Sequence, residues 1–183
     1  RIQGGCLYGG SKANLMAKIC VKSCSEDELR HVANTIGMAK QIAENYVVSQ
    51  RRGEGIFLGA WKDGSPVGHA FLQWNPQLRG EYAVRVQGNF ADTSNLSVVE
   101  EYRSQGIGSR IIQKAEEEAR DRGFELLRLA VDPEDNPRAH ALYLRHGFTD
   151  VGLPPFDASG TWIDQDGNEH PYEEWCINMT KRL

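Results

Sequence analysis

Seven residues near the middle of the chain constrain its fold more than any other segment. They stand between a strand-like segment and a segment with helical periodicity, and they read Arg103-Ser104-Gln105-Gly106-Ile107-Gly108-Ser109. A loop at this place leads into the first turn of a helix, where backbone N–H groups lack partners and the helix dipole is positive. Such a turn attracts anions, and glycines let its backbone come close to a phosphate. The segment therefore predicts a phosphate-binding loop.

Two common nucleotide-binding loops do not match this pattern. A dinucleotide-binding loop requires a third glycine where Ile111 stands, and a Walker loop requires a Gly-Lys pair followed by Ser or Thr, which this segment lacks. Both nucleotide-binding folds are therefore excluded.

The segments around the loop predict an α+β domain with a mixed sheet. A capping box of Ser25 and Glu28 begins the first helix, and Asp166-Gly167 indicates a hairpin turn. Hairpins come first along the chain, and a right-handed strand–helix–strand unit follows. Apolar spacing and turn residues predict helices over about 25–37, 38–50, 107–120 and 136–147, and strands over about 56–61, 67–72, 82–86, 95–99, 124–131, 148–151 and 175–179.

Residues 96–148 resemble the GNAT superfamily of acyl-CoA N-acyltransferases. The family pattern Arg/Gln-x-x-Gly-x-Gly/Ala is matched by Arg103, Gly106 and Gly108, and the strand before it is similar, with Glu100 where proline is common. Residues 136–148, from Asn-Pro to Gly-Phe, resemble the second cofactor-binding segment of the family. On these two linked segments the chain is identified as a member of the superfamily.

The resemblance implies a fold and a cosubstrate. The fold is α+β, with a mostly antiparallel sheet flanked by helices and a V-shaped splay between two parallel strands. The cosubstrate is acetyl-CoA, whose pantetheine arm would add to the strand near Leu96 to Val98 as an extra strand does. Backbone amides of residues 105–109 would cradle the pyrophosphate. The residues that the resemblance assigns to cofactor binding are Leu96, Val98, Arg103, Ser104, Gln105, Gly106, Ile107, Gly108, Ser109, Asn136 and Tyr143.

The resemblance also implies direct attack of a neutral amine on the thioester. This reaction needs a donor for the oxyanion, a base for the amine proton and an acid for the leaving thiolate. The backbone N–H of Val98 is the candidate donor. Tyr143 is the candidate acid, since a phenol with a pKa of about 10 holds its proton at neutral pH, and a core aromatic is the alternative interpretation. Asp92 is the candidate base, acting through a water, unless the substrate arrives neutral.

Other polar and reactive side chains receive no catalytic role. The histidines show no pattern of a metal site or a nucleophile pair, and Cys176 lies in a predicted strand without a nearby histidine. The cysteines lack the two paired arms of a zinc site, so no metal is predicted. Surface solvation is the simpler explanation for Glu81, Glu100 and Glu101.

The distribution of charge and the tryptophans indicate which kind of molecule would accept the acetyl group. No Lys or Arg lies between Arg145 and Lys181, whereas seven Asp and Glu residues do. This interval is either a solvated acidic hairpin or a negative rim that steers a cationic substrate. Trp61 and Trp175 are expected in the core. Trp74 and Trp162 are expected near loops, where they would line an acceptor pocket.

Composition argues against a nucleic-acid-binding protein and against a membrane-spanning protein. The net charge of −4 argues against nonspecific nucleic-acid binding, and no apolar run approaches the ~20 residues of a membrane span. The start of the chain lacks the pattern of a secretory signal. We therefore expect a soluble, cytoplasmic protein with a flexible tail over residues 1–14 and a single domain over residues 15–183.

The sequence thus predicts an acetyl-CoA-dependent N-acetyltransferase that acts on a primary amine. Charge alone favours a small cationic acceptor, of the aminoglycoside or polyamine kind. Acetylation of a protein lysine or N-terminus stays open, and so does a domain that binds acyl-CoA as a regulatory ligand without turnover. The expected partner is a small-molecule amine, with no nucleic acid and no membrane, and a homodimer stays open.

Overall fold

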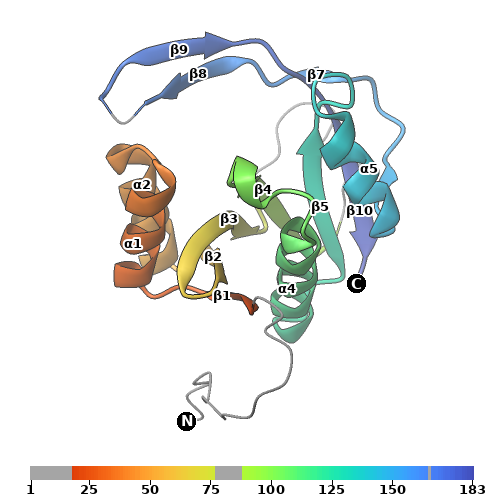
Figure 1. The fold of residues 1–183 in the computed structure, drawn as a ribbon. Coiled ribbons are helices and arrows are strands. Elements are labelled where there is room, and N and C mark those ends of the chain that lie inside the picture. The colour runs from red at the N-terminus through yellow and green to blue at the C-terminus, as the bar shows by residue number, and fades with distance from the viewer. Residues whose placement is uncertain (1–17, 77–87, 165) are drawn as a thin grey trace.

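The structure is a computed structural model that describes residues 18–76, 88–164 and 166–183. Within these residues, eight strands form one sheet, in which only β4 and β5 run parallel (Figure 1). Strand β7 (Phe156–Asp157) pairs with β10 beside the main order. That order is β1 (Ile19–Ser23), β2 (Gly55–Lys62), β3 (Ser65–Trp74), β4 (Phe90–Val98), β5 (Leu126–Val131), β10 (Trp175–Arg182) and β6 (Thr149–Asp150).

Helices cover both faces of this sheet. Phe57 and Phe71 pack with α1 (Glu26–Ile36) and α2 (Lys40–Arg51) on one face. Their neighbours Leu58 and Leu72 pack with α4 (Ile107–Asp121) on the other, because successive strand residues point to opposite faces. Tyr143 of α5 (Pro137–Arg145) joins the core on the α4 face. A short 3-10 helix, η1 (Glu100–Tyr102), connects β4 to the loop before α4.

Local sequence signals account for most of these elements. Ser25 caps α1 in the predicted capping box with Glu28, and Gly37 ends the helix in a left-handed conformation. Asp63 and Gly64 both have positive φ, of 50° and 87°, as a two-residue hairpin turn requires between β2 and β3. The predicted helices and the first hairpin are therefore confirmed, with shifts of at most two residues at their ends.

Two strands differ from the sequence prediction. Strand β1 was not anticipated, because its five residues carry no turn signal on either side. Strand β4 begins at Phe90 rather than at residue 95, since its first residues pair with β3 on one side and β5 on the other. The predicted strand over 82–86, Glu81 and the predicted tail over 1–14 lie outside the described residues.

The parallel pair separates toward the end of β4. Pairing with β5 covers Phe90–Thr93 only, while β4 continues to Val98. A bulge on β4 coincides with the separation, since three steps from Ser94 to Ser97 oppose two steps on β3. Asn95 adopts a φ of 51° within the bulge. The predicted α+β class, with a mixed and mostly antiparallel sheet that splays between parallel strands, is confirmed.

Among the described residues, no helix has both the length and the apolar character that crossing a membrane requires.

Candidate active site

The glycine-containing loop forms the N-terminus of α4. Gly106 is the N-cap residue, with a φ of 80°, and among the described residues the helix has no side-chain capping hydrogen bond. A cavity of about 660 Å³, here called the loop pocket, opens beside it. Its lining residues are Leu96, Ser97, Val98, Tyr102, Arg103, Ser104, Gly106, Gly108, Ser109, Asn136, Arg138, Ala139, Leu142 and Arg145.

Eight of the eleven residues predicted to bind the cofactor line the loop pocket, and three do not. Ile107 is buried in the core. The Gln105 side chain turns away, accepting a hydrogen bond from Lys62 at 2.6 Å and donating one to the Glu101 carbonyl. Tyr143 lies in the core. The backbone of Gln105 and Ile107 remains part of the loop, so their predicted contribution through amides is not affected.

Two basic residues in this pocket were missed by the sequence analysis. Arg138 donates a hydrogen bond to Ser104 Oγ at 3.2 Å, and Arg145 lines the same cavity. Both lie on α5 with Asn136 at its start, and their helical spacing could have indicated a shared face. With Arg103, they place three guanidinium groups around the open end of α4, an arrangement suited to a phosphate-bearing ligand.

The glycines fit such a ligand for two different reasons. A Cβ atom at Gly108 would lie 3.1 Å from Leu142, so this glycine allows α4 and α5 to approach. A Cβ at Gly106 would meet nothing within 4 Å, so Gly106 is required by its left-handed backbone and leaves open space at the loop. The residues present therefore fit a pyrophosphate held by backbone amides.

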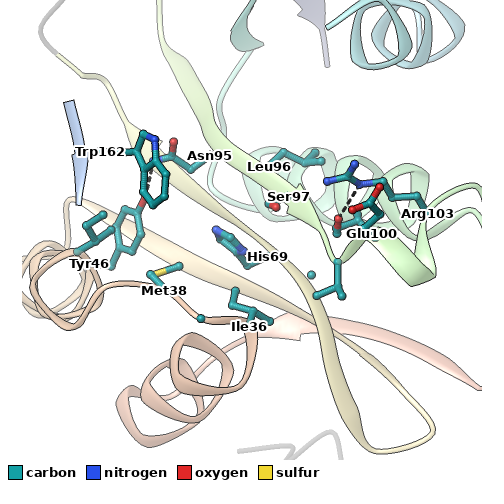
Figure 2. A pocket seen from close by; sticks show the side chains of 15 residues that line it. Ile36, Met38, Tyr46, His69, Asn95, Leu96, Ser97, Glu100, Arg103 and Trp162 are labelled. Atoms are coloured by element: carbon teal, nitrogen blue, oxygen red, sulfur yellow. Dashed lines mark hydrogen bonds between the residues drawn. The ribbon is translucent and has the colours of Figure 1, made fainter. Parts of the chain in front are cut away.

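A second cavity, of about 670 Å³, lies beside the bulge and is called the bulge pocket (Figure 2). Residues of α1, α2, β3 and the end of β4 line it, together with Trp162 from a C-terminal hairpin. Four residues, Leu96, Ser97, Val98 and Arg103, line both cavities. The two pockets therefore meet at the end of β4.

The backbone at this junction has an unpaired edge. Val99 donates its N–H to the Val67 carbonyl of β3. Because successive N–H groups of a strand point to opposite edges, that of Val98 points toward the side from which β5 has separated. The Val98 carbonyl accepts a hydrogen bond from Arg103 Nε at 3.1 Å, which ties the loop to the strand. The N–H that the sequence analysis selected thus faces the splay.

Tyr143 is buried, at 7% exposure, and its ring lies 6.0 Å from that of Phe148. Burial raises the pKa of its phenol to about 12, so the hydroxyl keeps its proton at neutral pH. Its neighbour Leu142 lines the loop pocket, whereas Tyr143 itself does not. Its role as the acid stays a prediction.

Asp92 lies in a buried polar cluster across β4, β5 and β10. It forms an ion pair with Arg128 at 2.5 Å, and Arg128 also donates a hydrogen bond to Asn178. Burial raises the pKa of Asp92, and the guanidinium of Arg128 opposes that shift. Asp92 lines neither pocket, so the structure does not bring this predicted base to the junction.

His69 is the residue of the bulge pocket that the sequence analysis left without a role. It stacks on Phe57 with ring centroids 5.5 Å apart, and burial lowers its pKa to about 4. Its Nδ1 is buried and has no hydrogen-bond partner. The signal in the sequence was a lone imidazole inside the apolar run 67–72, which is buried on both faces of the sheet.

Trp162 lines the bulge pocket, as predicted, and the other tryptophans differ in part from expectation. Trp61 packs partly buried against the core under α1 and α2, as expected. Trp175, expected in the core, is 57% exposed because it precedes the buried part of β10. Trp74, expected near a pocket, stacks instead on Phe124 at 5.1 Å.

The hairpin that carries Trp162 consists of β8 (Gly160–Ile163) and β9 (Glu169–Tyr172), on either side of the predicted Asp166-Gly167 turn. This hairpin extends from the side of the molecule that holds β10 and α5 toward α2 (Figure 1). Asp164 accepts hydrogen bonds from His170 and Asn168, which hold the pKa of its carboxyl well below the usual range. The indole of Trp162 stacks on His170 with ring centroids 4.3 Å apart.

Metal and thiol chemistry find no support in the described part of the chain. Its His, Cys, Asp and Glu residues form no group that could hold a metal ion. Burial raises the pKa of the Cys176 thiol to about 12, which keeps it from acting as a thiolate at neutral pH.

A helix N-terminus suited to a phosphate, an unpaired strand edge and two pockets that meet there are features expected of an acyl-CoA-dependent transferase. A family model described as "Acetyltransferase (GNAT) family" matches residues 24–148, and the chain belongs to this family. This family membership confirms the enzyme class predicted from the sequence, an acetyltransferase with acetyl-CoA as its cosubstrate.

A relative and several solved structures are similar to parts or most of the chain. A thialysine N-ε-acetyltransferase from Bos taurus is 49% identical over 57 residues, which are 31% of this chain and only 33% of the relative. An IAA acetyltransferase from Bacillus cereus has a TM-score of 0.61 and 20% identity, covering 91% of this chain and 100% of that one. A GNAT acetyltransferase from Elizabethkingia anophelis with acetyl-CoA bound has a TM-score of 0.60 and 15% identity, covering 90% and 98%. These structures share the fold.

Proposed function

We propose that this enzyme transfers the acetyl group of acetyl-CoA to the primary amine of a small cationic molecule, of the polyamine or aminoglycoside kind. The observation that carries the proposal is the bulge pocket, which meets the loop pocket at Ser97 and takes an aromatic wall from an acidic hairpin. An acceptor in this pocket would approach the thioester from the side opposite the phosphates.

Aromatic groups of this pocket, and acidic residues of the chain segment that carries Trp162, suit an ammonium group. Trp162 and Tyr46 line it, and the face of an indole or phenol ring attracts a cation by about 0.5–2 kcal/mol. The surrounding interval between Arg145 and Lys181 carries seven acidic residues and no basic ones. Its field raises the local concentration of cations by long-range attraction.

The bovine relative supports the same class of acceptor. Its name gives the ε-nitrogen of thialysine, a primary amine, as the group that it acetylates. The aligned region covers a third of that protein, so the support extends to the class of amine and not to thialysine itself.

The roles of the site residues follow from this reaction. Amides at the start of α4, with Arg103, Arg138 and Arg145, would hold the pyrophosphate, and Asn136 would contact the pantetheine arm. The Val98 N–H would donate to the oxyanion of the tetrahedral intermediate. Tyr143 would give its proton to the leaving thiolate.

The test is release of CoA thiol from acetyl-CoA by the purified protein with spermidine, kanamycin, thialysine, free amino acids and lysine peptides. Turnover with one of the small cationic amines, at a higher kcat/KM than with the peptides, is the expected result. Turnover confined to peptides would overturn the proposal and make the enzyme a protein acetyltransferase. The single domain over 15–183 and the cytoplasmic location stay predictions.

A further inference from the structure

His69 stands in the bulge pocket at the junction with the loop pocket. On β3 it is the register partner of Ser97 of β4, and partners on neighbouring strands lie about 5 Å apart and face the same side of the sheet. Ser97 lines both cavities. Figure 2 shows the His69 ring among the side chains that surround the bulge pocket. The imidazole is therefore adjacent to the residues where an acceptor amine would meet the thioester.

The hydrogen bonding of His69 is unusual for a buried histidine. The side chain is only 8% exposed, yet Nδ1 has no partner. A buried polar atom without a partner destabilises a fold, so most such atoms have a hydrogen-bond partner. Stacking on Phe57 fixes the plane of the ring without using its nitrogens. The ring is thus held in place, and its Nδ1 has no hydrogen-bond partner among the described residues.

Competing bases in the same pocket are few. Among its described lining residues, the only carboxylate is that of Glu100, which lies beyond the end of β4 in η1. Tyr46 carries a phenol whose pKa is raised by burial and whose oxygen accepts a hydrogen bond from Asn95. Arg103 is a cation. Asp92, the base that the sequence indicated, is paired with Arg128 outside the pocket.

We propose that His69 is the catalytic base, which takes the proton of the attacking amine through the lone pair of its neutral imidazole. This proposal rests on the proposed amine acetylation. The carboxylate of Asp92 takes no part in this proton transfer. The buried polar cluster of Asp92 and Arg128 then has a structural role.

The amine nitrogen forms a bond to the carbonyl carbon, and its N–H becomes acidic as the nitrogen acquires positive charge. That proton passes to His69, the C–S bond breaks, and the thiolate takes the proton of Tyr143. His69 releases its proton to water and Tyr143 regains one, so the net products are the amide and CoA thiol. Burial favours the neutral form of His69 at the start of every cycle.

The test compares His69→Phe with the wild-type enzyme on whichever acceptor of the panel the wild type acetylates. Phenylalanine keeps the stacking on Phe57 and removes both nitrogens. We expect kcat to fall by about 100-fold or more, the usual contribution of general acid–base catalysis, with the acetyl-CoA affinity by calorimetry changed by less than about threefold. His31→Phe, on the exposed side of α1, is the control and should retain full activity.

Chemical rescue separates a base from a packing residue. In His69→Ala the lost ring leaves space, and added imidazole should raise kcat in proportion to its concentration, while it leaves Tyr143→Phe unchanged. A His69→Phe enzyme with kcat within about threefold of wild type, or a His69→Ala enzyme that imidazole does not accelerate, would overturn the proposal. The kcat values of variant and wild type are compared on whichever amine the wild type acetylates. A wild type that acetylates only peptides would therefore overturn the proposed substrate and leave this test of His69 valid.

Discussion

His69 on β3 and Ser97 on β4 are register partners at the C-terminal end of the β4 bulge, where the two cavities of the site meet. The bulge turns Asn95 into a left-handed conformation and coincides with the loss of pairing between β4 and β5. The bulge thereby places His69, a polar residue of the buried strand β3, beside the unpaired edge of β4. Five predictions follow from this arrangement and its surroundings.

The first prediction concerns the stability of the enzyme against pH. The folded state lowers the pKa of His69 from 6.5 to about 4, so the unfolded chain binds more protons between these values. Stability is therefore fully present above pH 6.5 and falls as the pH drops toward 4, by roughly 3 kcal/mol at 1.36 kcal/mol per pKa unit. Urea unfolding at pH 7 and pH 5 measures it.

The control for this pH dependence is His69→Phe, which should lose that part of the slope. The titratable and charged groups that line the same pocket, Tyr46, Glu100 and Arg103, are kept in both proteins. Equal slopes in wild type and variant would show that His69 titrates as it does in the unfolded chain.

Replacement of Gly106 by valine should abolish tight binding of acetyl-CoA. A β-branched residue is strained at a φ of 80°, and its side chain would enter the open space at the start of α4. We expect at least a tenfold weaker affinity by calorimetry. Gly123→Val is the matched control, since Gly123 has a φ of 78° and equally open space far from the pocket. If both variants bind acetyl-CoA alike, the loop does not hold the cosubstrate.

Tyr143→Phe tests the candidate acid. The variant removes the hydroxyl and keeps the ring in the core with Phe148. The melting temperature and the acetyl-CoA affinity should stay within error, while kcat falls at least tenfold because the thiolate leaves without a proton donor. An unchanged kcat would assign Tyr143 to packing alone.

Trp162→Ala should raise the KM of the acceptor by about 3- to 30-fold, which corresponds to the loss of one cation–π contact. The KM of acetyl-CoA should not change, because Trp162 lines only the bulge pocket. Trp175→Ala is the matched control, since Trp175 is similarly exposed but lies outside both cavities. Steady-state kinetics with each substrate varied provides the comparison, and an unaltered acceptor KM would remove Trp162 from the acceptor site.

Asp92→Asn distinguishes the two candidate bases. Breaking a buried ion pair leaves the Arg128 charge uncompensated, so we expect a loss of about 3–5 kcal/mol in the free energy of unfolding. In the folded enzyme at low temperature, kcat should stay within about threefold of wild type. A large fall in kcat without a loss of stability would restore Asp92 as the base.

The loop pocket was predictable from the sequence, because it is built from short segments. Gly106 and Gly108 are selected by local backbone geometry and helix contact, and Asn136-Pro137 marks a helix start by itself. The β2–β3 hairpin was predictable for the same reason, since its Asp63-Gly64 turn depends on two adjacent residues. Such signals depend on residues that are close in the sequence, so they do not change with the surrounding tertiary structure. They also led to the correct family.

The acceptor side was decided by the tertiary structure. Asp92 and His69 are both polar residues in strands, and nothing nearby in the sequence tells which one faces a cavity. The register of β3 with β4 placed His69 beside Ser97, and the register of β4 with β5 placed Asp92 beside Arg128. Trp162 comes 65 residues after Ser97 in the sequence, and the β8–β9 hairpin brings it to the same pocket. Sequence determines what a local segment prefers, whereas burial and pairing between distant strands determine which polar groups remain free to react.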